Sequence, residues 1–286
     1  MTGSTGFVGS NLLPKLKNEF TVFNPNRREL NLFDVNDLKY YLRNNNIDYI
    51  VHSASPSPQR QTGDLKENIL GDMLSLFASI SEMSSICDKV IYFGSGAEYD
   101  KSRSIISAKE DEIGAYIPKD DYGFAKYLMN KMTRNSDNIY NFRLFGCFGP
   151  RDYPNKFITH AIRSVILDKQ ISIRKDCYFD YLHVNDLANT VIWGLSHDLK
   201  HHDYNVCSGA RMKLSEIAQI VITEMNSNQT IRILDDSGFA NEYTGSNGRL
   251  INEMAKNTFS SIAEGIRSQI AWEFENWSED VIFDGE

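Results

Sequence analysis

The chain has 286 residues, of which 41% are hydrophobic and 24% charged, a composition typical of a globular protein with a full core. Its net charge of −8 argues against nucleic acid or a membrane surface as a partner. No apolar run reaches the roughly 18 residues of a membrane span, and no signal-peptide pattern opens the chain. We therefore expect a cytoplasmic protein. Four widely spaced cysteines predict buried or half-buried thiols and no metal site: Cys87, Cys147, Cys177 and Cys207.

Short apolar runs alternate with longer amphipathic stretches, which predicts an α/β fold with a Rossmann-type, doubly wound parallel sheet. Strands are expected at 20–23, 48–53, 89–94 and 138–145, and helices at 10–18, 36–43, 64–84 and 122–134. Further helices are expected at 157–167, 186–195, 214–225 and from a capping box at Ser261 and Glu264 to about 277. This pattern divides the chain into a dinucleotide-binding domain, 1–150, and a smaller, mainly substrate-binding lobe, 151–286, whose strands can return to the sheet.

The opening residues MTGSTGFVGS place Gly3, Gly6 and Gly9 at the spacing of a dinucleotide-binding loop. Glycines allow a pyrophosphate to approach the backbone, and the following helix offers free N–H groups and a positive dipole end. Such a loop normally follows a buried strand, yet only Met1 and Thr2 precede it. We expect the first strand to be missing, through a misassigned start or because the chain is a truncated copy. A glycine-rich turn without function is the alternative.

Two further features point to proton transfer. Tyr122 and Lys126 in YGFAK are four residues apart, so a helix projects both from one face. A lysine ammonium beside a tyrosine lowers the phenol pKa from about 10, and the pair can then move a proton to or from a sugar hydroxyl. Ser95 in YFGSGAEY follows an expected central strand, at the edge where α/β sheets build their sites. Each feature alone is also typical of an exposed helix or a turn.

The order of these features resembles the extended short-chain dehydrogenase/reductase family, within it the NAD(P)-dependent nucleotide-sugar epimerases and dehydratases. The segments TGSTGFVGS, RRELNLFD, IDYIVHSAS, RLFGCFGP and FDYLHVNDLA are similar to motifs of that group, closest to GDP-fucose synthase-like 4-ketoreductases. The resemblance implies a catalytic trio of Ser95, Tyr122 and Lys126. It also implies cofactor contacts from Gly3, Thr5, Gly6, Phe7, Val8, Gly9, Arg27, Arg28, Asp34, Val35, Ser53, Ala54, Asn68, Tyr122 and Lys126.

The cofactor and reaction follow from departures within this resemblance. Arg27 and Arg28 follow the expected strand at 20–23, where NAD-preferring sites usually carry Asp or Glu. Arginine suits a 2′-phosphate, so we expect NADP(H), with NAD(H) as the alternative. Gly96 and Ala97 stand where 4,6-dehydratases carry Asp-Glu, which disfavours dehydration. Ala97 also replaces the cysteine with which GDP-fucose synthases epimerise C3 and C5. The expected reaction is 4-keto reduction or 4-epimerisation of a nucleotide-diphosphate sugar.

A further group of residues is expected to contact the substrate. The resemblance implies contacts from Gly96, Ala97, Lys156, His183 and Arg249, although His183 also fits a packed, hydrogen-bonded histidine. It implies a homodimer formed through the helices at 64–84 and 122–134. The absent strand leaves a second hypothesis open, that of a non-catalytic member which binds or senses a nucleotide.

Overall fold

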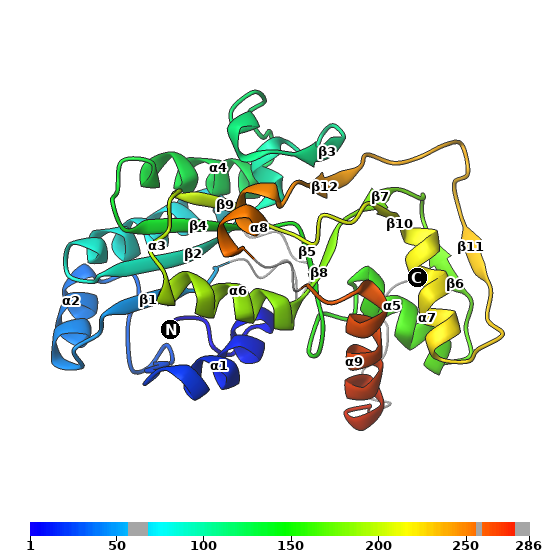
Figure 1. Cartoon of the computed structure of the whole chain (residues 1–286), viewed down its shortest axis with the longest axis horizontal. Coiled ribbons are helices and arrows are strands. Elements are labelled where there is room, and N and C mark those ends of the chain that lie inside the picture. The colour runs from blue at the N-terminus through cyan, green and yellow to red at the C-terminus, as the bar shows by residue number, and fades with distance from the viewer. Residues whose placement is uncertain (57–67, 256–258, 278–286) are drawn as a thin grey trace.

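The computed structural model describes residues 1–56, 68–255 and 259–277, and consists of a sheet domain joined to a smaller lobe (Figure 1). Four parallel strands form the described main sheet, in the order β1-β2-β4-β9. Their bounds are Tyr49–His52, Lys89–Ser95, Ile139–Leu144 and Asp203–Val206. The expected α/β fold with a parallel sheet is confirmed, and β9 returns to this sheet from beyond residue 150.

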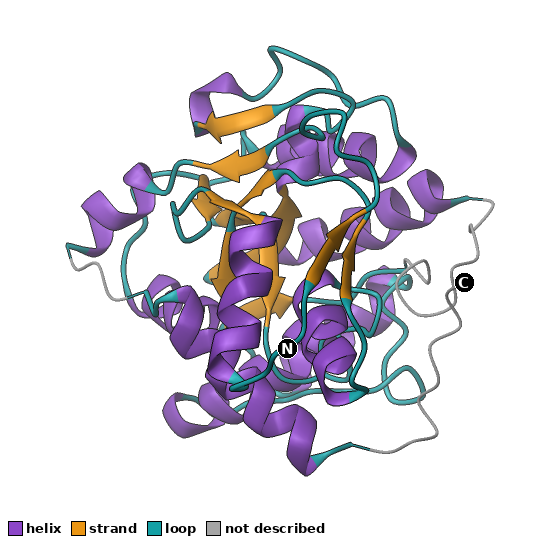
Figure 2. Cartoon of the chain, turned by 90° about the vertical axis from the view of Figure 1, so that its right-hand side faces the viewer, coloured by secondary structure: helices purple, strands orange, loops and turns teal. Residues whose placement is uncertain are grey.

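Helices cover both faces of the main sheet (Figure 2). One face packs against α1 (Phe7–Glu19) and α6 (Val184–Ser196), and the other against α2 (Val35–Asn44), α3 (Ile69–Glu82) and α4 (Asp121–Thr133). Side chains alternate along β2, so Ile91 and Phe93 enter the first core whereas Val90 and Tyr92 enter the second. All seven residues of β2 are buried, as expected for a parallel strand between two helical layers.

The smaller lobe has a core of its own. It is formed by α5 (Phe157–Ile166), α7 (Leu214–Glu224) and α9 (Ile262–Glu275), together with β6 (Ile171–Ile173) and β11 (Ile231–Ile233). The predicted capping box of α9 is confirmed: the Glu264 amide donates to Ser261 Oγ, and the Ser261 amide donates to the Glu264 carboxylate. The other expected helices are also found within a few residues, and residues 64–67 of the expected 64–84 helix lie outside the described residues.

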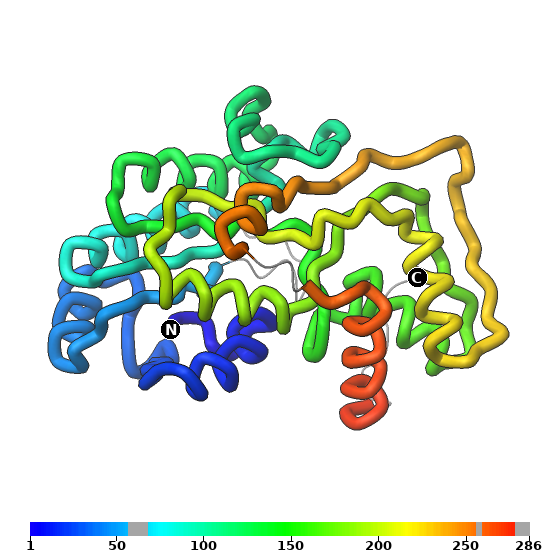
Figure 3. The backbone as a smooth tube through the Cα atoms, in the orientation of Figure 1, coloured from blue at the N-terminus to red at the C-terminus, as the bar shows by residue number. Residues whose placement is uncertain are grey.

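Short elements connect the lobe to the sheet domain. The chain leaves β11, runs back along the lobe and pairs β12 (Tyr243–Gly245) with β3 (Ile105–Ala108), as the tube in Figure 3 shows. The same small sheet holds β7 (Tyr178–Phe179) and β10 (Met212–Lys213), while β5 (Gly146–Phe148) pairs with β8 (Tyr181–His183). Helix α8 (Gly248–Met254) and the 3₁₀ turns η1 (Met83–Ser85), η2 (Gly96–Tyr99) and η3 (Glu110–Glu112) complete the elements. β12 thereby reaches the sheet domain.

The expected strand at 20–23 is wrong, because this segment joins no sheet in the described structure. At the outer edge of β1, Thr2 makes an isolated parallel bridge with His52. The Met1 ammonium donates to the Phe23 carbonyl oxygen at 2.6 Å. In the described structure, residues 20–23 thus have Met1 and Thr2 beside them. A ladder of strand hydrogen bonds would require a longer neighbouring strand.

The cysteines occupy the environments that their spacing predicts. Cys87, Cys177 and Cys207 are buried and Cys147 is half-buried, each as a free thiol. Burial raises the pKa of the Cys87 thiol to about 11, with the nearby Asp88 and Asp48 carboxylates adding to the effect. Among the helices of the described residues, none is both long and apolar enough to cross a membrane.

Candidate active site

The glycine loop lies against the carboxyl end of β1. Gly3 has a φ of +69°, and a Cβ there would stand 2.6 Å from the Ser53 carbonyl carbon, so both backbone conformation and packing require glycine. A Cβ on Gly9 would overlap the Gly3 carbonyl oxygen, which shows how closely α1 packs onto the loop. The structure therefore brings Ser53 and Ala54 next to the loop, as a shared cofactor site requires.

The N-terminus of α1 has the features of a pyrophosphate site. No side chain caps it at Gly6, and its first turn carries no acidic residue. Its first N–H groups are therefore available to an anion. Phe7 is buried and Val8 half-buried, which anchors the helix in the core, while Thr5 is exposed in the turn. These residues fit a dinucleotide cofactor, although their contacts with one stay a prediction.

The remaining predicted cofactor residues lie at helix starts and in one turn. Asp34 caps α2 by accepting from the amides of Asn36 and Asp37, and Val35 begins that helix. Asn68 caps α3 by accepting from the Gly71 amide at 3.3 Å. Arg27 and Arg28 are exposed in a turn. The contacts of these residues with a cofactor stay predictions.

The proposed catalytic residues converge on the carboxyl end of β2. Ser95 ends the strand and is 8% exposed, and its Oγ accepts from the Ala97 amide at 3.2 Å. Lys126, on α4, is also 8% exposed, and its Nζ donates to the Phe93 carbonyl oxygen at 2.6 Å. Because Phe93 is two residues before Ser95 on the same strand, this bond fixes α4 against the serine's strand.

Tyr122 is half-buried in the first turn of α4 and has cations close to its ring. The Lys126 Nζ lies 6.0 Å from the ring centroid, and the Lys101 Nζ lies 5.8 Å from it. A lysine ammonium beside the tyrosine ring is the arrangement that the sequence predicts for proton transfer by this pair. The arrangement therefore suits a tyrosine that takes up and releases a proton.

Three residues that the sequence did not predict contact Ser95 directly or through one neighbour. The Tyr243 hydroxyl on β12 lies 3.4 Å from Ser95 Oγ. Glu98 accepts from the Ser95 amide at 3.0 Å, and Asn130 of α4 donates to Glu98 at 2.9 Å. Local signals existed for two of them: Ser95 and Glu98 form the S-x-x-E capping box, and Asn130 is four residues after Lys126. Tyr243 is too distant in sequence to carry a signal.

The predicted substrate residues are dispersed. Gly96 and Ala97 are buried in η2 directly after Ser95, and Lys156 is exposed at the N-cap of α5. His183 is buried against Phe148, and burial, with a smaller effect of the Lys15 charge, lowers its pKa to about 4. Arg249 forms an ion pair with Asp203 at 2.6 Å, beside β9. Only Gly96 and Ala97 adjoin the serine, and the substrate roles of the others stay predictions.

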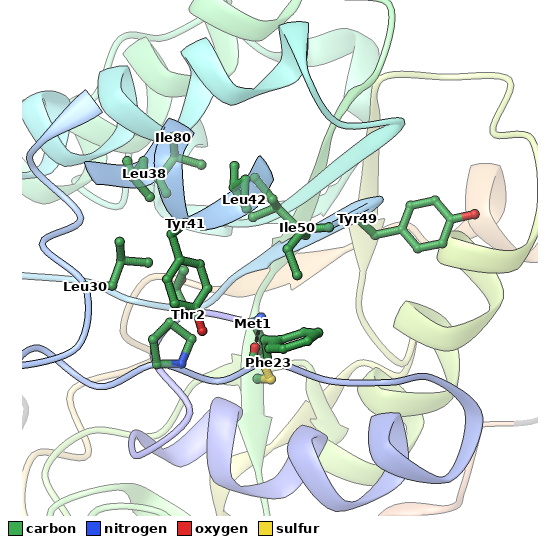
Figure 4. Close-up of a pocket in the computed structure, with 12 residues that line it drawn as sticks. Met1, Thr2, Phe23, Leu30, Leu38, Tyr41, Leu42, Tyr49, Ile50 and Ile80 are labelled. Carbon is green, nitrogen blue, oxygen red and sulfur yellow. Dashed lines mark hydrogen bonds between the residues drawn. The ribbon is translucent and has the colours of Figure 1, made fainter. Parts of the chain in front are cut away.

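A small apolar cavity, partly open to solvent, lies at the outer edge of β1 (Figure 4). Figure 4 shows Leu38, Tyr41 and Leu42 of α2 on one side of it and Ile50 of β1 on another. Met1 and Thr2 also line it, whereas Ser95, Tyr122 and Lys126 do not. The cavity therefore borders the residues that precede the glycine loop and none of the proposed catalytic residues.

His52 makes the folded state sensitive to acid. Burial, and then the positive charges of Lys126 and the N-terminus, lower its pKa from 6.5 to about 3. Between these values the unfolded state binds one more proton, so the free energy of unfolding falls as the pH falls, by up to about 1.4 kcal/mol per pH unit. We expect the free energy of urea unfolding, measured from pH 7 to pH 4, to fall with this slope. In His52→Asn the slope should be smaller by the contribution of about one proton. An unchanged slope in that variant would contradict the assignment.

Comparison with known proteins agrees with this geometry. The profile of the NAD dependent epimerase/dehydratase family matches residues 1–207. The chain belongs to this family. CDP-abequose synthase from Salmonella muenchen is 24% identical over 257 residues, which covers 81% of this chain and 82% of that protein.

Solved structures of the same fold include enzymes with either cofactor. A dTDP-glucose 4,6-dehydratase from Bacillus anthracis in complex with NAD superposes with a TM-score of 0.80 at 15% identity, covering 96% of each chain. A GDP-L-fucose synthetase from Naegleria fowleri bound to NADP has a TM-score of 0.78 at 16% identity, covering 96% of this chain and 92% of that one. This chain is thus an NAD(P)-dependent epimerase/dehydratase family enzyme, and these likenesses leave its cofactor preference open.

Proposed function

We propose that this enzyme transfers hydride between NADP(H) and C4 of a nucleotide-diphosphate sugar, as a 4-ketoreductase or a 4-epimerase. One observation carries the proposal: Lys126, four residues after Tyr122 on α4, donates to the Phe93 carbonyl, two residues before Ser95 at the carboxyl end of a central parallel strand. Membership of the family supports the class of reaction, and the name of the Salmonella relative supports a nucleotide-linked sugar as product.

The chemistry divides between cofactor and protein. A bound nicotinamide supplies or accepts the hydride. In the reductive direction Tyr122 donates its phenolic proton to the oxygen at C4, and in the oxidative direction its phenolate removes that proton. Lys126, fixed by the Phe93 carbonyl, stabilises the phenolate. Ser95 Oγ, already oriented by the Ala97 amide, hydrogen-bonds the same oxygen and holds it next to Tyr122.

Net dehydration is disfavoured by the residues around Ser95. Gly96 and Ala97 cannot act as acid or base, and the next residue, Glu98, is fully buried and accepts bonds from four side-chain and backbone donors. Ala97 also cannot perform the C3 and C5 epimerisation of a GDP-fucose synthase. The two remaining reactions differ in cofactor balance: a reductase consumes NADPH, whereas an epimerase returns the hydride. We favour reduction because NADPH is the usual donor in net reductions.

The preference for NADPH depends on Arg27 and Arg28. Both are exposed, and their guanidinium groups can bind a 2′-phosphate. We expect the double variant Arg27→Ala/Arg28→Ala to bind NADPH about 10- to 100-fold more weakly, because charge-assisted hydrogen bonds to the 2′-phosphate are lost. NADH binding should be unchanged, because NADH has no 2′-phosphate. Titration followed by tryptophan fluorescence measures both. Arg43→Ala, which removes another exposed arginine, is the matched control. Equal effects on the two cofactors would refute the preference.

A second candidate function follows from the cavity beside β1. At this place, within the described residues, the outer edge of β1 is paired by the Thr2–His52 bridge alone, so few sheet hydrogen bonds hold the glycine loop. The chain would then be a non-catalytic member that binds or senses a nucleotide. Turnover of any nucleotide 4-keto sugar, lost in Tyr122→Phe, rejects this alternative. A folded protein that binds NADPH without turnover supports it.

Three further assignments accompany the proposal. The enzyme works in the cytoplasm, and it pairs as a homodimer through α3 and α4, which pack against one another. Residues 1–150 hold the dinucleotide, and residues 151–286 mainly hold the sugar. Light scattering of the wild-type protein tests the dimer directly, with a monomer mass as the contrary result.

A further inference from the structure

A buried carboxylate lies directly behind the catalytic serine. Glu98, three residues after Ser95, is 0% exposed. Its Oε1 accepts from the Ser95 amide at 3.0 Å, and its Oε2 accepts from Asn130 at 2.9 Å and from the Arg143 Nε at 2.8 Å. Asn141 donates to both oxygens, at 3.2 and 3.3 Å. The carboxylate therefore accepts from donors on β2, α4 and β4.

These donors come from both halves of the proposed catalytic apparatus. Ser95 ends β2, whereas Asn130 belongs to α4, four residues after Lys126 and eight after Tyr122. On a helix such spacing places the three side chains along one face. Glu98 thus links the strand of the serine to the helix of the tyrosine, independently of the bond between Lys126 and the Phe93 carbonyl.

Stability alone does not account for the buried ion pair between Glu98 and Arg143. Arg143 is 0% exposed and also donates to Asp203 at 2.9 Å. Taking two charges out of water costs several kcal/mol for each ion, and well-packed apolar side chains in such places are often as stable or more stable. The ion pair instead fixes the positions of its partners, because charge-assisted hydrogen bonds are short and directional.

We infer that Glu98 is a positioning residue, which sets the orientation of the Ser95 hydroxyl relative to Tyr122 by bonding the serine's amide and the Asn130 side chain. It touches neither substrate nor cofactor and acts through Ser95. The inference rests on the proposed function, because that function makes the serine–tyrosine geometry matter. A shift of about 1 Å between reacting groups can cost on the order of 10²-fold in rate.

The test is a double-mutant cycle on turnover. In Glu98→Gln the side chain keeps its shape, but its amide nitrogen cannot accept from Asn130, Asn141 or Arg143. We expect kcat to fall about 10- to 100-fold with both KM values nearly unchanged. In a Ser95→Ala background the same substitution should have almost no further effect, because the residue it positions is gone. A wild-type kcat, or an undiminished loss in the Ser95→Ala background, would overturn the inference.

The matched control is Glu273→Gln in the smaller lobe. Glu273 is also buried and pairs with Arg163 at 2.9 Å, between α9 and α5. A purely structural role predicts the same behaviour in both variants, namely lower stability with kcat retained. If Glu98→Gln does not fold, Asn130→Ala replaces it, because this variant breaks the link to α4 and leaves the Glu98–Arg143 pair intact.

Failure of the proposed function is distinguishable from failure of this inference. If the wild type turns over no nucleotide sugar, the proposed function fails. Crystal structures of the wild type and Glu98→Gln then decide the positioning role by themselves. A displaced Ser95 hydroxyl in Glu98→Gln, with no displacement in Glu273→Gln, supports it, and an unchanged serine overturns it.

Discussion

Replacing Tyr122 by Phe is expected to lower kcat by about 10³-fold, within the range that a positioned acid–base group contributes. The substitution removes only the hydroxyl that moves the proton and keeps the ring near the Lys126 and Lys101 ammonium groups. NADPH binding should therefore persist. The measurement is kcat with a nucleotide 4-keto sugar, beside a fluorescence titration of the cofactor.

Tyr127→Phe provides the control for this prediction. Tyr127 lies on the same helix and stacks against Phe124, with a lysine 5.1 Å from its ring. It therefore shares helix, residue type and a neighbouring cation with Tyr122, but not the place next to the serine's strand. Equal activities of the two variants would remove Tyr122 from the mechanism.

Replacing Arg143 by Met is expected to have the largest effect on stability, lowering the free energy of unfolding by about 3–5 kcal/mol. Burial alone would lower the pKa of Arg143, but the charges of Glu98, Tyr99 and Asp203 raise it well above its usual value. Its guanidinium is thus held charged between Glu98 and Asp203. Methionine would leave the Glu98 carboxylate buried without its cation.

Urea unfolding of Arg143→Met and Arg267→Met at one pH measures this difference. Arg267 pairs with Glu224 at 2.8 Å, but its side chain is 53% exposed. An exposed pair contributes about 0–1 kcal/mol, so the control should change stability little. A comparable, small loss in both variants would show that the Arg143–Glu98 pair is not coupled to folding.

Periodicity in the sequence predicted the elements whose stability depends on their own amphipathic pattern. α2, α5 and α9 each carry an apolar stripe and start near their expected residue, and α9 also has its predicted capping box. The strand at 20–23 failed because strand formation requires a neighbour, which a local pattern does not specify. In the described structure the adjacent place holds Met1 and Thr2.

In the candidate site, too, local sequence patterns predicted some residues, whereas others are brought in by packing between distant segments. Tyr122 and Lys126 could be paired from their spacing, and Ser95 from its place after a strand. Glu98 and Asn130 come together only because α4 packs on β2. Tyr243 lies 148 residues beyond Ser95 in sequence, so its approach depends on the return of the chain from the smaller lobe. Long-range packing of this kind leaves no trace in a window of sequence.

The most direct test of the account follows a labelled hydride. NADPH carrying deuterium at C4 of the nicotinamide is incubated with the wild-type chain and a panel of CDP-, dTDP-, GDP- and UDP-linked 4-keto sugars. Proton NMR then locates the label in the product. We predict consumption of NADPH and deuterium at C4 of one sugar. Binding of NADPH without transfer to any of the panel, or label at another carbon, would contradict a 4-ketoreductase that depends on Ser95, Tyr122 and Lys126.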